Sequence, residues 1–175
     1  MELSTARLII RPFVPSDITE VYLTGLNDPA VIGLTEARHM SWNRHTAEEF
    51  VNSANSSTSI LLGAFLRPDY KPIGNIRLFN IHPIHRHAEL SLLFYDKSEW
   101  SRGYATEAVR SVVNFAFSDL KLHRVFADYY SINIASSMMF KKVGFVNEGV
   151  FRDHFFVGDG KYVDSVRIGL TNMNQ

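Results

Sequence analysis

The chain has 175 residues, of which 46% are hydrophobic and 13% aromatic, so it can close one core but is too short for two ordinary domains. Lysine plus arginine equals aspartate plus glutamate at 18 each, so no net charge draws the protein to nucleic acid or to an anionic membrane. The absence of cysteine excludes disulfides, thiolate metal sites and a covalent thiol intermediate. We therefore expect a single domain, residues 1–175, with no nucleic-acid partner.

The longest apolar run, residues 60–66, is far shorter than the roughly 18 residues that a membrane helix needs. The opening MELSTARLII has neither a basic n-region nor a long apolar h-region. These features predict no membrane partner and a cytoplasmic location.

The N-terminal part alternates between strand-like and helix-like patterns. Residues 7–13 form a β-rich run that ends at prolines. Ser16 and Asp17 offer helix caps ahead of apolar residues at helical spacing, which predicts a first helix directly after them. Thr46 and Glu49 form an S/T-x-x-E capping box, which predicts that a second helix begins at Thr46.

The remaining elements predict one continuous α/β succession. Three strand-like stretches separated only by turn-rich segments predict an antiparallel meander, at 59–66, 73–82 and 88–95. Later patterns predict a helix at 105–120, a strand at 123–130, a helix at 133–143 closed by Gly144, and strands at 145–152 and 162–170. The expected fold class is α/β, with a mixed, mostly antiparallel central sheet of about seven strands and helices on both faces.

The segment W-S-R-G-Y-A, residues 100–105, joins the last strand of the meander to the long helix. A glycine-bearing turn at this position points several backbone N–H groups, and the positive end of the helix dipole, at one spot. Gly103 gives a ligand close access to the backbone. The turn favours phosphate binding, but by itself it also fits an ordinary helix start.

Three separated motifs carry a family resemblance. AELSLLFYDKSEWSRGYATEAVRSVVNFAF (88–117), NIASSMMFKKVGF (133–145) and GVFRDHFFVGDGKYVDSVRIGL (149–170) resemble the GNAT acetyltransferases, specifically the ribosomal-protein N-terminal acetyltransferase (RimJ/RimL-like) branch. The opening TARLIIRPFVPSDI (5–18) is similar to that branch as well, so the resemblance covers essentially the whole chain. It implies the GNAT fold, in which two middle strands splay apart and acetyl-CoA lies in the opening.

The resemblance also implies which residues bind the cofactor. The family's pyrophosphate loop, usually Q/R-x-x-G-x-G/A, falls on residues 100–105, although Trp100 stands where many members have Gln or Arg. The pantetheine arm is implied to pair with the main chain of the preceding strand, and an asparagine to reach it from the other side. The cofactor-binding residues implied in this way are Leu92, Leu93, Phe94, Ser101, Arg102, Gly103, Tyr104, Ala105, Thr106 and Asn133.

Two residues match catalytic positions of the family. Glu89 lies where many members carry a general base, acting directly or through water; the alternative is a solvated or salt-bridged strand carboxylate. Many members use a tyrosine on the penultimate helix as the acid, but that position here is Phe140, which cannot donate a proton. Ser136 matches a serine that serves instead in the RimJ/RimL-like branch; the alternative is a first-turn serine bonded to local backbone.

Other features carry weaker signals. His82, His85 and His87 suggest a metal site, but no carboxylate pattern accompanies them and we expect no metal. Basic residues around Trp42 either meet an acidic substrate or form a solvated loop; they are Arg38, His39, Arg44 and His45. Four aromatic residues either line the same acceptor groove or belong to the core; they are Phe151, Phe155, Phe156 and Tyr162.

Together these observations predict an enzyme that transfers acetyl directly from acetyl-CoA to a primary amine, since no cysteine exists to hold the acyl group. The acceptor is either a protein N-terminus or a small-molecule amine such as an amino sugar or a polyamine. The alternative is a non-catalytic acyl-CoA-binding module. The sequence leaves the oligomeric state open, a homodimer included.

Overall fold

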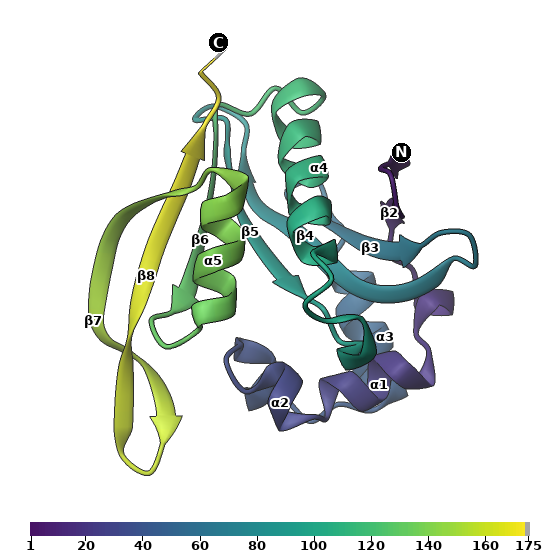
Figure 1. The fold of residues 1–175 in the computed structure, drawn as a ribbon, viewed down its shortest axis with the longest axis horizontal. Coiled ribbons are helices and arrows are strands. Elements are labelled where there is room, and N and C mark those ends of the chain that lie inside the picture. Colours follow the sequence, from purple (N-terminus) through teal and green to yellow (C-terminus); the bar gives the residue numbers. More distant parts are fainter. Residues whose placement is uncertain (174–175) are drawn as a thin grey trace.

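The computed structural model describes residues 1–173 and contains one eight-stranded sheet with helices on both faces (Figure 1). The strands are β1 (Leu3–Ser4), β2 (Leu8–Pro12), β3 (Ile60–Leu66), β4 (Lys71–His82), β5 (His87–Leu93), β6 (Arg124–Tyr130), β7 (Val146–Gly158) and β8 (Lys161–Thr171). The α-helices are α1 (Glu20–Leu26), α2 (Pro29–Ile32), α3 (Arg44–Ser53), α4 (Tyr104–Ser118) and α5 (Ile134–Val143). The 3-10 helices are η1 (Pro15–Asp17), η2 (Glu36–His39) and η3 (Lys97–Glu99).

The strand order is β1-β2-β3-β4-β5-β6-β8-β7, which confirms the predicted mixed, mostly antiparallel sheet. The predicted meander is present as β3, β4 and β5, each antiparallel to the next. The sheet has eight strands rather than about seven, because the two-residue β1 pairs with β2. Strand β7 also runs well past its predicted end at residue 152, since bulges in its pairing with β8 interrupt the apolar alternation.

Both predicted caps of the N-terminal helices were wrong. Helix α1 begins at Glu20 and is capped by Thr19, whose hydroxyl accepts the Tyr22 N–H at 3.2 Å. Asp17 instead binds the Arg11 guanidinium, with N–O distances of 2.7 and 2.8 Å. The Asp17 carboxylate therefore serves this ion pair and the Val14 N–H at the start of η1, and it does not cap α1.

Helix α3 begins two residues before its predicted start. Asn43 is its cap, and its side chain accepts the Thr46 N–H at 3.0 Å. The Thr46 hydroxyl in turn accepts the Asn43 N–H at 3.0 Å, so Thr46 is the third helical residue of a capping box and not its first residue. The helical turns α2 and η2, which lie between α1 and α3, were not predicted because each has only four residues.

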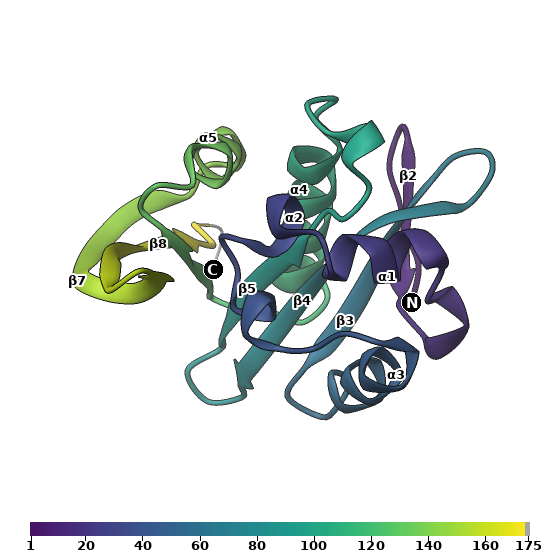
Figure 2. The ribbon, with the colours of Figure 1, turned by 90° about the horizontal axis from the view of Figure 1, so that it is seen from below.

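The sheet separates two apolar cores. Helices α4 and α5 cover one face, where Leu8 and Ile10 of β2 are buried with Val112 of α4. Helices α1, α2 and α3 cover the other face, where Ile9 and Leu61 are buried (Figure 2). Neighbouring residues of a strand thus point into different cores, as strand geometry requires. No helix among residues 1–173 combines the length and the apolar character needed to cross a membrane.

The sheet opens between β5 and β6, which are the only parallel neighbours within the described residues. Their pairing covers three positions and ends at Glu89, which lies opposite Phe126. Beyond that point β5 stays with β4 as far as Leu93, while β6 stays with β8 as far as Tyr130 (Figure 1). The splay implied by the family resemblance is therefore present, and one edge of residues 90–93 is not paired with a strand.

Candidate cofactor and acceptor site

A cavity of about 540 Å³ lies at the opening of the sheet. Its walls come from the end of β5, the loop before α4, the first turn of α4, one side of α5 and the segment around α2. It is lined by every predicted cofactor residue except Arg102, namely 92–94, Ser101, 103–106 and Asn133, and also by Ser136. The side chain of Arg102 pairs instead with Glu99 at 3.1 Å.

The loop before α4 presents a row of free backbone donors to this cavity. Gly103, at φ +82°, is the N-cap of α4, and Ser101 is also left-handed at φ +62°. The first intrahelical bond runs from the Glu107 N–H to the Gly103 carbonyl at 3.1 Å. Among residues 1–173, nothing accepts the N–H groups of residues 101–106. Left-handed turns next to a helix N-terminus make a concavity that attracts anions.

Ion pairs hold the segment between β5 and this loop in place. Lys71 at the start of β4 contacts Asp96 at 2.7 Å and Glu99 at 3.1 Å, and the hydrogen bond to Asp96 is the main reason that the pKa of Lys71 is raised. Trp100 adds a second tie, because its indole N–H donates to the Phe94 carbonyl at 2.8 Å. The Trp100 side chain, for which the sequence pattern indicates no function, thus links the loop to the end of β5.

Helix α5 supplies the opposite wall. Asn133 caps it by accepting the Ser136 N–H at 3.0 Å, which leaves the amide nitrogen of Asn133 without a partner among the described residues. The hydroxyl of Ser136 likewise has no partner there, so the alternative of a serine bonded to local backbone is not what the structure contains. Met139 and Lys142 follow Ser136 at helical spacing and line the same cavity. Lys142 is not among the residues implied by the family resemblance, although its spacing from Ser136 and Met139 indicates this position.

Phe140 does not reach the cavity. It is 3% exposed and packs against Phe145 and Tyr129, with ring centroids 5.1 and 6.3 Å apart. The position of the family's tyrosine therefore holds a core residue in this chain.

Glu89 does not line the cavity, and it points to the face of the sheet opposite the buried Ala88 and Leu90. It is half-buried, and its carboxylate accepts the Asn80 amide N–H at 3.2 Å. Burial is the largest effect on its pKa and raises it; the Asn80 bond lowers it, and the charge of Asp128 raises it further, so the net shift is upward. Glu89 thus has a raised pKa beside the opening.

Asn80 owes its position to a β-bulge. The β4–β5 register shifts between Phe79 and His82, and Asn80 adopts a left-handed φ of +52°. The bulge places its side chain against Glu89. Because the register shift cannot be read from the sequence pattern, Asn80 was not predicted.

The same face of β6 carries further polar groups. Asp128 is held by Arg167 in a two-bond ion pair at 2.5 and 2.9 Å. Two residues on, the Tyr130 hydroxyl donates to Glu36 of η2 at 2.5 Å, and the ring of Phe155 stacks on Tyr130 at 3.9 Å. The segment around η2 is therefore tied to β6 and β7.

The aromatic residues of the predicted groove do not belong to the core. Phe151, Phe156 and Tyr162 are 46%, 44% and 55% exposed, and Phe155 is the member that packs inward on Tyr130.

The basic residues around Trp42 do not form a common patch. Arg38 donates to the carbonyls of Gly33 and Phe156, and its Nε–H donates to His39. Arg44 pairs with Glu20 at 3.1 Å, and His45 lies 3.3 Å from Glu49. These side chains are engaged by other protein groups, so the hypothesis of an acidic substrate loses its basis.

The three histidines of the β4–β5 hairpin form a stack. The rings of His82 and His85 lie 4.3 Å apart, and His82 Nδ1 already accepts the His85 backbone N–H. Within the part of the chain that the structure describes, no group of three His, Cys, Asp or Glu residues is arranged to hold a metal ion.

The family model described as "Acetyltransferase (GNAT) domain" matches residues 7–146 of the chain. The chain belongs to the GNAT acetyltransferase family. YoaA of Bacillus subtilis (strain 168), named an uncharacterized N-acetyltransferase, is 28% identical to this GNAT protein over 166 residues, which is 94% of this chain and 93% of YoaA. The spermidine N(1)-acetyltransferase of Vibrio cholerae is 28% identical over 96 residues, 55% of this chain and 54% of that protein.

Solved structures share the fold. A structure titled "Crystal structure of Probable acetyltransferase" has a TM-score of 0.83 at 24% identity and covers 98% of this chain and 97% of its own. The spermidine N-acetyltransferase of Vibrio cholerae in complex with CoA and spermine has a TM-score of 0.81 at 20% identity, with 95% and 96% coverage. This GNAT protein is accordingly an N-acetyltransferase that uses acetyl-CoA.

Replacing Gly103 by valine should weaken CoA binding by about tenfold to a hundredfold, because a β-branched residue at positive φ is strained by about 1–3 kcal/mol and displaces the loop donors. Isothermal titration with CoA measures the effect. Gly160→Val is the matched control, since Gly160 has φ +70° in the β7–β8 turn with nothing within 4 Å of an added Cβ. Parental affinity in Gly103→Val would refute the loop assignment.

Proposed function

We propose that the cavity holds acetyl-CoA and that the acetyl group passes directly to a primary amine arriving through the opening beside Glu89. The observation that carries this proposal is the row of free N–H groups at residues 101–106, all of which except Arg102 line the cavity at the splay of the sheet. The pyrophosphate accepts from these donors and the ammonium of Lys142 opposes the phosphate charge. The pantetheine arm bonds to the main chain of residues 92–94 and to the free amide of Asn133. We also take residues 1–175 to be one domain.

Glu89 is the general base in this proposal. An alkylamine has a pKa near that of lysine, about 10.4, so the acceptor is protonated in solution and must lose a proton before it attacks the thioester. Since Glu89 lies outside the cavity lining, its carboxylate removes that proton through an intervening water. Its raised pKa brings the base closer to neutral pH, where proton transfer is more effective.

Ser136 assists the departing thiolate. Its hydroxyl lines the cavity and has no partner among residues 1–173, so it can donate to the sulfur as charge develops there. The CoA thiol has a pKa near that of free cysteine, about 8.5, so its thiolate needs only a hydrogen bond worth about 1 kcal/mol.

A small cationic molecule, such as a polyamine, is the acceptor in this proposal. Carboxylates gather on the acceptor face of the sheet: Glu89, Asp128 beside it, and Glu36 on Tyr130. Of these three carboxylates only Asp128 has an arginine as ion-pair partner, so Glu89 and Glu36 are the groups left to attract a cationic acceptor. Relatives named spermidine N(1)-acetyltransferases support this acceptor class. A protein N-terminus, the acceptor of the RimJ/RimL-like branch, is the competing class.

Free-thiol release from acetyl-CoA in the presence of an amine panel tests the reaction and the acceptor together. We expect release above the amine-free rate with spermidine, and much slower release with an amino sugar or a short peptide with a free N-terminus. Release only with the peptide would assign the acceptor to the RimJ/RimL-like class. CoA binding without release for any amine would favour the non-catalytic acyl-CoA-binding module.

Glu89→Gln should lower kcat by about 10²–10⁴-fold with the Kd for CoA nearly unchanged, because glutamine keeps the shape but cannot accept the proton. The base works only when ionised, so activity should fall as pH drops through the raised pKa of Glu89. Asn80→Ala removes a bond that favours the ionised form and should move this acid limb to higher pH. Glu48→Gln, on α3, is the control; full turnover of Glu89→Gln at every pH would make Glu89 structural.

Ser136→Ala should slow single-turnover acetyl transfer by about tenfold, since about 1.4 kcal/mol of barrier corresponds to that factor. Rapid-mixing experiments at saturating acetyl-CoA isolate this step. Ser137→Ala is the control, because Ser137 is adjacent on α5 and does not line the cavity. A change in CoA affinity alone, with transfer unaltered, would assign Ser136 to cofactor binding.

A further inference from the structure

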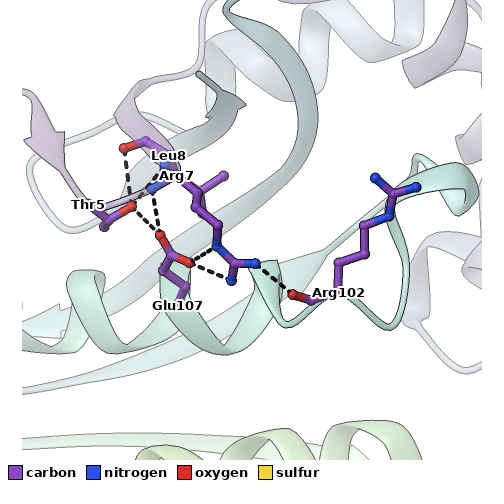
Figure 3. Close-up of polar contacts among 5 residues, drawn as sticks. All are labelled: Thr5, Arg7, Leu8, Arg102 and Glu107. Atoms are coloured by element: carbon purple, nitrogen blue, oxygen red, sulfur yellow. Dashed lines mark hydrogen bonds and ion pairs between the residues drawn. The ribbon is translucent and has the colours of Figure 1, made fainter. Parts of the chain in front are cut away.

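The N-terminal segment contacts the loop before α4 and the first turn of that helix (Figure 3). The Arg7 guanidinium donates from Nη1 to the carbonyl of Arg102 at 2.9 Å and from Nε to Glu107 at 2.7 Å. Its Nη2 lies 2.6 Å from the same Glu107 carboxylate. All three nitrogens of the side chain are therefore engaged, two on the first turn of α4 and one on the loop itself.

Glu107 is fixed from the other side. Its second carboxylate oxygen accepts the Thr5 hydroxyl at 2.6 Å and the Arg7 backbone N–H at 3.0 Å (Figure 3). Burial acts to raise the pKa of Glu107, but the bonds from Thr5 and Arg7 outweigh it and hold the pKa below its usual range. Thr5 is itself held, because its hydroxyl accepts the Leu8 N–H at 2.9 Å.

The carbonyl that Arg7 binds belongs to the residue between the two left-handed positions of the loop, Ser101 and Gly103. The guanidinium also lies 4.5 Å from the ring centroid of Tyr104. A Cβ added to Gly103 would lie 3.6 Å from Arg7 Nη2. Arg7 therefore contacts Arg102 and Tyr104 and lies close to Gly103 between them, in the turn that presents the free donors.

We propose that Arg7 and Glu107 are positioning residues that hold the cofactor loop in its anion-binding conformation. This inference rests on the proposed function of the loop. Left-handed residues other than glycine are unfavourable, so Ser101 needs an outside contact to stay at positive φ. The bond to the Arg102 carbonyl supplies it, and the ion pair to Glu107 fixes the arginine relative to the helix that follows.

Arg7 acts through the loop and not as a direct ligand of the phosphates. It does not line the cavity, and its guanidinium nitrogens are occupied by protein groups. The planar guanidinium of Arg7 uses three nitrogens at once, and a lysine ammonium cannot reproduce this arrangement. Lysine at this position should therefore keep the positive charge but fail to hold the loop.

The test compares CoA with S-acetylpantetheine, which lacks the pyrophosphate. For Arg7→Met and Arg7→Lys we expect the Kd for CoA to rise by about tenfold to a hundredfold, as for loss of a hydrogen bond to a charged group. The KM for S-acetylpantetheine should stay at the parental value. A merely structural residue would change both. Arg7→Lys binding CoA like the parent would overturn the proposal, since charge alone would then suffice.

Arg11→Met is the matched control, because Arg11 lies four residues further on, in β2, also makes a two-bond ion pair with a carboxylate, Asp17, and does not touch the loop. It should lower the melting temperature without changing the Kd for CoA. An equal rise in Kd for Arg11→Met and Arg7→Met would refute the positioning role.

Glu107→Gln provides a second variant if Arg7→Met does not fold, and it should weaken CoA binding in the same direction; unchanged binding would count against the proposal. The Gly103→Val result separates this inference from the proposed function. If Gly103→Val weakens CoA binding and Arg7→Met does not, only the positioning role fails. If neither does, the loop assignment itself fails.

Discussion

Everything in the candidate site depends on the short parallel pairing between β5 and β6. Three paired positions hold the two halves of the sheet together, and the pairing ends at Glu89. From there each strand keeps only its antiparallel partner, so a gap opens in the middle of an otherwise continuous sheet. The gap joins the face covered by α4 and α5 to the face covered by α1, α2 and α3. In the proposed function, the cofactor on one side and the acceptor on the other meet through this opening.

The sequence predicted long periodic elements well and short ones poorly. The strands of the meander, α4 and α5 follow from apolar periodicity, and Gly144 ends α5 at φ +112° as expected. The four-residue α2 has too few residues for a period, although it walls the cavity. The predicted helix caps were wrong at both N-terminal helices. The carboxylate of Asp17 forms an ion pair with Arg11, and Thr46 is the third residue of a helix that Asn43 caps.

The residues of the candidate site likewise divide into those that local sequence predicts and those that depend on tertiary contacts. The loop at Gly103 was predictable because backbone geometry and a helix start are local properties. Asn80 and Arg7 were not, since one depends on a register shift and the other on a contact between distant segments. Glu89 was identified through family resemblance alone, and its distance from the cavity lining could not be foreseen from motif spacing. Its half-buried position follows from the opening, which no single strand encodes.

The tie between Arg7 and Arg102 spans 95 residues of sequence. The turn proposed to bind the phosphates therefore depends on tertiary contacts and is not set by its local sequence alone. A fragment containing W-S-R-G-Y-A and α4 would retain the glycine and the helix dipole, but it would lack the guanidinium that holds the turn. Grafting this motif onto an unrelated helix would transfer its sequence but not its backbone conformation. If Arg7 holds the turn as proposed, a residue at the start of the chain belongs to the binding apparatus of a loop 95 residues away.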